Sequence, residues 1–221
     1  MYIKREEIIA KLDKISIKDI DSGIYPNFEI LIYAIMKKED KLFKKVLDRM
    51  IGKEEFYRLL DFSKETQSYT ILHLATIENN IKAVESLLVN KKISPNVMTK
   101  QGLTPLMIAA KKGYYEITEI LIKNGANINT TSKTKNSAIM YAASSNGESN
   151  YKIAKYLLEK DSKIDNQNKK GNTALIISAM KNIKIYNCLI EKGADTEIRN
   201  KEGKLAIDYY LENTSLEKTQ Y

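Results

Sequence analysis

The chain has little of what most catalytic and metal-binding sites are built from. It contains a single cysteine and a single histidine among 221 residues. It can therefore form neither an internal disulfide framework nor a metal site with paired cysteine or histidine ligands. A glycine-rich phosphate loop and a nucleophile motif are absent as well. With no candidate catalytic, cofactor-binding or metal-binding residue, we expect a protein that is not an enzyme and carries no cofactor.

Long apolar runs are also missing from the sequence. No segment reaches the roughly 18 consecutive apolar residues that suggest a membrane-spanning helix. The first 14 residues, MYIKREEIIAKLDK, lack the apolar core of a signal peptide. An apolar content of 43% and a charged content of 29% suit a soluble folded chain. We therefore expect a cytoplasmic protein that is a monomer by itself and has no membrane partner.

The segment 99–129, TKQGLTPLMIAAKKGYYEITEILIKNGANIN, organises the rest of the chain. Thr104 predicts an N-cap, and Pro105 suits the first helical position, where its missing N–H would have had no partner. Gly113 tolerates positive φ, so the chain can turn into a second helix there. That helix has an apolar stripe at helical spacing, formed by Ile117, Ile120, Leu121 and Ile122. Neither helix can bury its stripe alone, so the unit needs neighbours.

Similar units recur along the chain at a nearly fixed interval. Each begins with a turn that leads into a short helix, and the corresponding positions are Thr70, Thr104, Ser137, Thr173 and Leu205. The intervals between these positions are 34, 33, 36 and 32 residues. A repeat of this length indicates an elongated stack in which each unit packs only on its neighbours.

Several short motifs match one repeat family residue for residue. They are Thr104-Pro105-Leu106, Thr70 with Leu72-His73, and Gly193-Ala194-Asp195. With these motifs and its period, the chain resembles the ankyrin-repeat family over roughly residues 27–211. The resemblance implies an all-α solenoid of stacked helix-turn-helix units with short β-turn or hairpin tips.

The resemblance also divides the chain. We expect an N-terminal capping helix and linker at 1–26, a repeat array at 27–211 and a frayed C-terminal tail at 212–221. The array has five to six repeats, of which the first and last are degenerate, with approximate bounds 27–65, 66–98, 99–131, 132–167, 168–199 and 200–211. The predicted helix pairs are 71–78 with 81–89, 105–111 with 115–123, 138–145 with 151–159, and 174–180 with 184–191.

Four departures from the regular unit are predicted. Residues 50–64 are expected to add a helical turn to the first repeat. In the second repeat, Asn79 is expected to take the left-handed conformation that Gly113 takes in the third. Residues 144–150 of the fourth repeat predict a longer polar loop between its helices. The fifth repeat is one residue short around residues 181–183.

Three features allow both a structural and a functional interpretation. Residues 3–14 predict an amphipathic helix, which either covers the apolar end of the stack or lies on a membrane surface; its acidic residues favour the first. His73 either supports its turn, as the resemblance implies, or acts in catalysis, and the structural role is favoured. Cys188 is expected to be a small buried hydrophobic residue, not a reactive thiol.

Partners of ankyrin-repeat proteins bind at the turn tips and on the exposed side of each first helix. Carried over by alignment, the resemblance places partner-binding residues at Lys100, Gln101, Leu103, Lys111, Lys112, Lys133, Thr134, Asn136, Lys169, Lys170, Asn172, Met180 and Lys181. Five further aligned positions are Ser144, Ser145, Lys201, Glu202 and Lys204. Of these 18 positions nine are lysine and one is acidic, whereas lysine and arginine together are 36 of 221 residues overall. The surface is therefore either a functional basic groove or the plain solvated face of a basic protein.

These observations support three hypotheses about function. The first is a protein-interaction module that binds an acidic segment of another protein through its concave face and turn tips. The second is nucleic-acid binding, which a net charge of +8 permits. It is less favoured, because the clustered arginines and interleaved aromatic residues that commonly serve base recognition are missing. The third is an accessory subunit that acts purely as a scaffold and whose charge is incidental.

Overall fold

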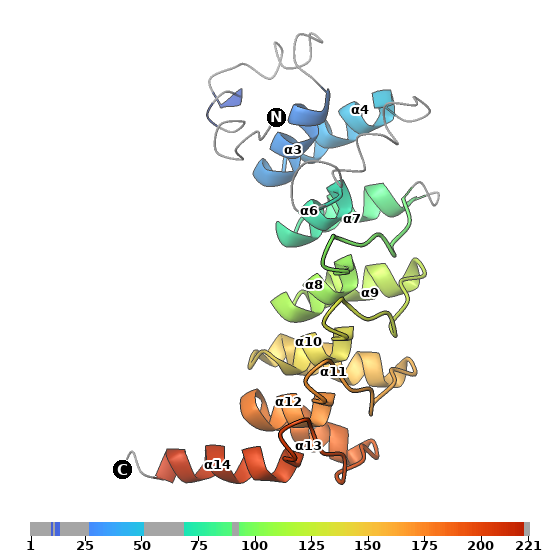
Figure 1. Cartoon of the computed structure of the whole chain (residues 1–221). Helices are drawn as coiled ribbons and strands as arrows, with labels where there is room; N and C mark the ends of the chain where they lie inside the picture. The colour runs from blue at the N-terminus through green and yellow to red at the C-terminus, as the bar shows by residue number, and fades with distance from the viewer. Residues whose placement is uncertain (1–9, 11, 14–26, 51–68, 90–92, 219–221) are drawn as a thin grey trace. The chain divides into compact units, whose positions relative to one another are not determined.

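The computed structural model describes residues 10, 12–13, 27–50, 69–89 and 93–218. The regular structure in these ranges is helical, and the only bridge between extended residues joins Thr131 to Ser137. The helices follow one another as short antiparallel pairs (Figure 1). The predicted all-α repeat architecture is therefore confirmed.

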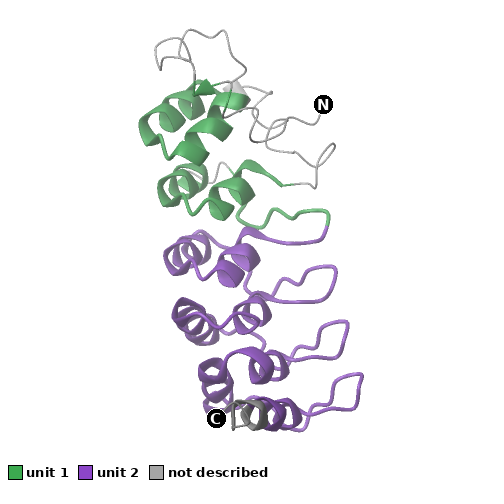
Figure 2. Ribbon diagram, turned by 90° about the vertical axis from the view of Figure 1, so that its left-hand side faces the viewer, with its two compact units in different colours: residues 1–100 green, residues 101–221 purple. Residues whose placement is uncertain are grey.

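The chain divides into two compact units, residues 1–100 and 101–221 (Figure 2). The described helices of the first unit are α3 (Asn27–Lys37), α4 (Asp40–Met50), α6 (Ile71–Ile77) and α7 (Ile81–Leu88). Within this unit, α3 packs against α4 and α6 against α7. The two pairs also pack on each other, with α3 against α6 and α4 against α7.

The second unit repeats this arrangement over more pairs. Its helices are α8 (Pro105–Lys112), α9 (Tyr115–Lys123), α10 (Ala138–Ala143), α11 (Glu148–Glu159), α12 (Ala174–Lys181), α13 (Ile183–Glu191) and α14 (Ala206–Lys218). The first helices form one layer, because α8 packs on α10, α10 on α12 and α12 on α14. The second helices form another, in which α9 packs on α11 and α11 on α13. Each pair thus buries its apolar side against the next pair.

The first helices begin at the residues that the repeat motif predicts. The hydroxyl of Thr104 accepts the N–H of Met107 at 3.3 Å, and the hydroxyl of Thr173 accepts the N–H of Ile176 at 3.2 Å. Pro105 occupies the first turn of α8. These bonds satisfy N–H groups that have no partner inside the helix.

His73 and Cys188 are both structural residues. His73 is fully buried, and its Nδ1 accepts the backbone N–H of Thr70 at 3.1 Å, which closes the turn before α6. Cys188 lies on the inward side of α13, and its burial raises the pKa of the thiol. The turn-supporting hydrogen bond expected of His73 and the burial expected of Cys188 are both confirmed.

The core combines close helix approach with large apolar side chains. Ala109 and Ala110 on α8 are fully buried, and their small side chains allow the neighbouring first helix to approach closely. On the second helices, Leu121, Leu157 and Leu189 occupy equivalent inward positions, and each is fully buried. A helix of eight or nine residues is marginal in isolation, so its stability comes from this packing.

The turns between paired helices follow the predicted pattern in two repeats. Gly113 ends α8 with φ of 76°, and Asn79 takes the same left-handed conformation with φ of 51° after α6. In the fifth repeat, Asn182 is both the C-cap of α12 and the N-cap of α13. The predicted left-handed asparagine and the one-residue deletion are both confirmed.

The fourth repeat differs from the prediction at the insertion. Helix α10 ends at Ala143 and α11 begins at Glu148. The sequence predicts that the first helix ends at residue 145 and that the second begins at residue 151. Only residues 144–147 lie between the helices, and the rest of the insertion extends α11 at its N-terminus. Asn150 lies inside this added turn and is buried. Its side chain bonds to the preceding repeat.

The expectation of a frayed tail from residue 212 is wrong for residues 212–218, which continue α14 to Lys218. Two contacts hold this part of the helix. Glu212 accepts a hydrogen bond from Lys204 Nζ at 2.7 Å, and the Asn213 side chain donates to the carbonyl of Ala179 at 3.1 Å.

Two predictions lie mostly outside the described residues. They are the helical turn expected at residues 50–64 and the helix expected at 3–14, of which only residues 10, 12 and 13 are described. Leu12 is buried, and the carboxylate of Asp13 accepts hydrogen bonds from Tyr33 Oη at 3.1 Å and Lys37 Nζ at 2.8 Å. None of the described helices is both long and apolar enough to cross a membrane.

Buried asparagines connect successive helix pairs. The Asn80 side chain donates to the carbonyl of Ile35 at 3.0 Å, Asn150 to that of Ala110 at 2.7 Å, and Asn182 to that of Ser145 at 2.9 Å. In each case the acceptor lies near the C-terminal end of the preceding first helix, where carbonyls lack an intrahelical partner. Asn80 and Asn182 also accept an N–H of their own helix through Oδ1.

Replacing Leu121 with alanine is expected to destabilise the fold by roughly 2–5 kcal/mol, through lost apolar burial and a residual cavity. Lys112→Ala should change the free energy of unfolding by less than about 0.5 kcal/mol, because Lys112 is exposed. Urea unfolding followed by circular dichroism measures both variants. Equal stabilities for the two would contradict the assigned packing.

Asn182→Asp separates the two roles of this residue. The carboxylate can still accept the Ile185 N–H as an N-cap, but it cannot donate to the Ser145 carbonyl. We expect a loss of about 1–3 kcal/mol, since a partly buried carbonyl is left without its donor. Asn187→Asp, on the exposed side of the same helix, is the control and should change stability by less than about 0.5 kcal/mol. Identical melting curves for the two variants would show that the Asn182–Ser145 bond contributes nothing.

Candidate partner-binding surface

The tips between helix pairs are joined to one another through the backbone. In the second unit, the N–H of Lys133 donates to the carbonyl of Gln101 at 2.9 Å, and the N–H of Lys169 donates to that of Thr134 at 3.0 Å. The next step repeats this bond between Lys201 and Lys170, also at 3.0 Å. Because the bonded residues are equivalent in successive repeats, the tip side chains are held in register.

Asparagine side chains support the same tips from within. Asn168 Oδ1 accepts the N–H of Asn172 at 3.1 Å, and its Nδ2 donates to Asn136 Oδ1 at 2.8 Å. One repeat later, Asn200 Nδ2 donates to Asn172 Oδ1 at 2.9 Å. The predicted partner-binding residues Asn136 and Asn172 therefore each use their amide oxygen inside the protein, between one tip and the next.

The close approach of successive tips requires glycine at two positions. Gly171 has φ of 77°, and a Cβ atom there would lie 2.7 Å from the backbone nitrogen of Lys201. At Gly102 the corresponding distance, to the nitrogen of Lys133, is 3.0 Å. The fourth repeat has Lys135 at this position, with φ of 61°. An L-residue in this region is strained, so the fourth tip keeps its shape at an energetic cost.

The predicted partner-binding side chains are accessible to solvent. Those that are exposed are Lys100, Gln101, Lys111, Lys112, Lys133, Thr134, Lys169, Lys170 and Lys181, and those that are partly exposed are Leu103, Asn136, Asn172 and Met180. Lys100 belongs to the first unit and the others to the second. Accessibility permits binding at these residues, and their role stays a prediction.

The lysines in this set have no acidic partner in the described parts of the chain. The ion pairs found there in the second unit involve other lysines, such as Lys184 with Glu148 and Lys123 with Glu119. The hydrogen bond from Lys184 lowers the pKa of the Glu148 carboxyl, as expected for a paired acid. We call Lys111, Lys112, Lys133, Lys169, Lys170 and Lys181 the lysine face; all belong to the second unit.

The lysine face flanks the first helices at both ends. Lys133, Lys169 and Lys170 lie in the tips before α10 and α12, and the other three lie at the C-terminal ends of α8 and α12. A helix of eight residues is about 12 Å long, which sets the separation of the two rows. Lysines of this face therefore lie at both ends of α12, at the C-terminal end of α8 and before the N-terminus of α10.

Sequence reasoning missed the residues between these two rows. Ile108, Tyr141, Ile177 and Tyr209 occupy one equivalent position on α8, α10, α12 and α14. Ile108 is 9% exposed and the other three are partly exposed. The hydroxyl of Tyr141 donates to Ser132 Oγ in its own tip at 3.4 Å, which places the ring beside the tip. The signal was available, because each residue comes four positions after the start of its repeat motif.

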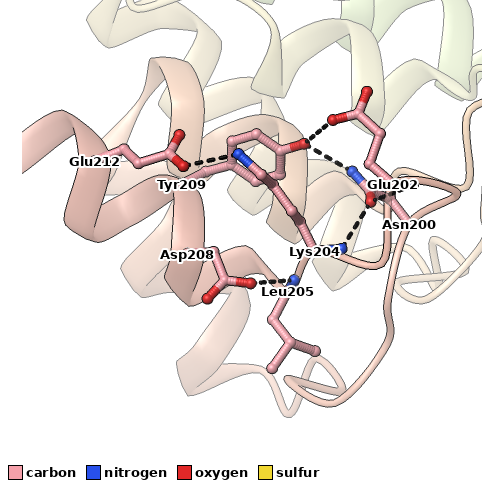
Figure 3. Close-up of polar contacts among 7 residues, drawn as sticks. All are labelled: Asn200, Glu202, Lys204, Leu205, Asp208, Tyr209 and Glu212. Carbon is pink, nitrogen blue, oxygen red and sulfur yellow. Dashed lines mark hydrogen bonds and ion pairs between the residues drawn. The ribbon is translucent and has the colours of Figure 1, made fainter.

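The sixth repeat, which follows the last lysine of this face, contains a compact polar cluster (Figure 3). The hydroxyl of Tyr209 accepts a hydrogen bond from Asn200 at 2.9 Å and donates one to Glu202 at 3.0 Å. Lys204 lies with Nζ 4.8 Å from the Tyr209 ring centroid and 2.7 Å from Glu212. The hydrogen bond to Glu212 raises the pKa of Lys204. Lys204 was counted among the basic surface positions, but its charge is neutralised within this cluster.

Comparison with known proteins identifies the repeats. A family model described as ankyrin repeats (3 copies) matches residues 31–132 and again residues 124–200. The human protein "Ankyrin repeat and KH domain-containing protein 1" is 37% identical over 111 residues, covering 49% of this chain and 4% of the human protein. This chain spans 3–5% of the length of that protein and its similarly named relatives in worms and fly.

Two bacterial proteins are also similar to parts of this chain. A "Putative ankyrin repeat protein" of Rickettsia felis is 32% identical over 164 residues, covering 70% of this chain and 71% of that protein. "Phosphocholine transferase AnkX" of Legionella pneumophila is 33% identical over 108 residues, covering 48% of this chain and 11% of the transferase. The family model and the stacked helix pairs agree, so the chain belongs to the ankyrin-repeat family, whose repeats generally serve as protein–protein interaction modules.

Proposed function

We propose that the chain is a non-catalytic interaction module that binds an acidic segment of another protein along the lysine face. The observation that supports this proposal most directly is the set of six exposed lysines without an acidic partner among the described residues. Unpaired lysines repel one another when their positions are fixed, and the backbone bonds between tips fix several of them. An anionic partner relieves that repulsion, so a surface of this kind favours acidic ligands.

Apolar contacts supply the rest of the binding energy in this proposal. An exposed ion pair contributes only about 0.2–1 kcal/mol, so lysines alone give weak and poorly selective binding. Tyr141 and Ile177, partly exposed between the two lysine rows, are the anchors nearest the centre. Leu103 and Met180 are further candidates at the edges, and methionine adapts to varied partners. The matching ligand has apolar side chains flanked by acidic ones.

Nucleic-acid binding remains the alternative that the net charge of +8 permits. The face contains lysine and no arginine, whereas bidentate base recognition uses arginine most often. A purely scaffolding role is the other alternative. We further propose that the protein is cytoplasmic and monomeric by itself, in keeping with its single buried cysteine. The enzymatic activity in the name of the Legionella relative is not carried over, because this chain covers 11% of that protein.

Reversing three lysines of this face tests the proposal. The variant Lys111→Glu/Lys112→Glu/Lys181→Glu should bind a glutamate-rich peptide with interspersed aromatic residues roughly tenfold or more weakly than the unchanged protein, since three weak pairs are lost and three repulsions gained. Fluorescence anisotropy in low salt measures the affinity. Added salt should weaken the unchanged complex and slow its association first.

A matched control carries the same change in net charge elsewhere. Lys152→Glu/Lys155→Glu/Lys192→Glu alters exposed lysines of the second-helix layer and also lowers the net charge from +8 to +2. This control should keep most of the affinity for the peptide. Equal losses in both variants would mean that only net charge matters. Tighter binding of duplex DNA than of the peptide, abolished by the first variant alone, would favour the nucleic-acid alternative.

A further inference from the structure

The sequence contains two Asn-Gly dipeptides, Asn124–Gly125 and Asn146–Gly147. In such a pair the glycine nitrogen can attack the side-chain amide carbon of the asparagine, because glycine has no Cβ to hinder the approach. The two dipeptides have the same chemistry but differ in how the fold holds their reacting groups. They therefore allow a comparison within one molecule.

Asn146–Gly147 lies in the short connection between α10 and α11, and both residues are exposed. In the part of the chain that the structure describes, no hydrogen bond engages the Asn146 side chain or the N–H of Gly147. Only the Gly147 carbonyl is engaged, as the acceptor for Asn150 at 3.1 Å and Tyr151 at 3.3 Å. The electrophilic carbon and the attacking nitrogen are thus both free to move.

At Asn124–Gly125, by contrast, both reacting groups are held. The Asn124 side chain donates to the Ile120 carbonyl at 2.8 Å. The N–H of Gly125 donates to the carbonyl of Ile122 at 3.0 Å. Ring closure requires the amide nitrogen and the side-chain carbon to leave these positions, so the helix end protects this asparagine.

We propose that Asn146 is a site of spontaneous modification, at which the side-chain amide is converted to a carboxylate by way of a cyclic imide with Gly147. The Gly147 nitrogen bonds to Asn146 Cγ and loses its proton, while the Cγ–Nδ2 bond breaks and ammonia leaves. A water molecule then adds to either imide carbonyl and opens the ring. The products are aspartate and its β-linked isomer, and no oxidant or reductant is involved.

The fold itself explains why a glycine follows Asn146. A Cβ atom at Gly147 would lie 2.6 Å from Asn150 Oδ1. Asn150 is the buried residue that bonds to the carbonyl of Ala110. A larger residue at 147 would therefore displace the connection between two repeats. The labile dipeptide is a by-product of this packing.

The modification would change the surface proposed for partner binding. Each event replaces a neutral amide by a carboxylate and so lowers the net charge from +8 to +7. The adjacent Ser145 donates through its hydroxyl to the Lys111 carbonyl at 3.0 Å and accepts the Asn182 side chain at 2.9 Å. The β-linked product adds one carbon to the backbone beside these contacts. This consequence is separate from the proposed function, and the site exists whether or not an acidic partner binds.

Peptide mapping by mass spectrometry tests the assignment. The purified, folded chain is incubated at mildly alkaline pH in water enriched in heavy oxygen, and the two asparagine peptides are followed over time. The Asn146 peptide should gain one heavy oxygen as it loses ammonia, about tenfold or more faster than the Asn124 peptide, whose reaction requires hydrogen bonds to break. The Asn146→Gln variant should show no such change at residue 146.

The same chain unfolded in urea is the reference for intrinsic reactivity. There the two dipeptides should react at similar rates, because the fold no longer distinguishes them. The proposal is overturned if Asn124 reacts as fast as Asn146 in the folded protein. It is also overturned if Asn146 stays unmodified in the folded chain while the unfolded chain reacts at that position.

Discussion

Within each compact unit, every helix pair depends on a neighbouring pair for burial, and the other features of the structure follow from that dependence. Helices of six to nine residues gain little from their own hydrogen bonds. They persist because alanines such as Ala110 admit a neighbouring helix and leucines such as Leu121 fill the space between layers. Stacking also partly buries backbone carbonyls at the ends of the first helices, and these carbonyls need a hydrogen-bond donor. The side chains of Asn80, Asn150 and Asn182 satisfy them, and so the polar and apolar contacts select the same spacing between pairs.

The sequence predicted the architecture well because it is repeated. Thr70, Thr104 and Thr173 recur at the repeat period, and each marks the start of a first helix. Because the repeats within a unit make similar contacts with their neighbours, those contacts favour the helix that the local sequence already predicts. The errors occur where one copy departs from the others. Counting residues against the third repeat placed the insertion of the fourth in a loop. Residues 148–150 instead belong to α11, where Asn150 bonds to Ala110, and sequence spacing alone does not reveal such a contact.

Prediction of the candidate surface was less complete, for a related reason. Alignment finds the exposed lysines, since exposure follows from repeat position. It does not show that the amide oxygens of Asn136 and Asn172 are already used between tips, or that Lys204 is neutralised by Glu212. These facts depend on rotamers and on neighbouring repeats. The partly exposed row that includes Tyr141 and Ile177 was overlooked because the positions carried over by alignment did not include it.

The tips and the inter-helix connections lie at opposite ends of the first helices, and this separation bears on how such a chain can evolve. The fourth repeat has gained residues at its connection and the fifth has lost one, yet the tip bonds from Lys169 and Lys201 are both 3.0 Å long. Length changes at one end are absorbed there and do not shift the register at the other. Insertions and deletions can therefore accumulate in the connections while selection acts separately on the tips, and recognition can change without a redesign of the stack.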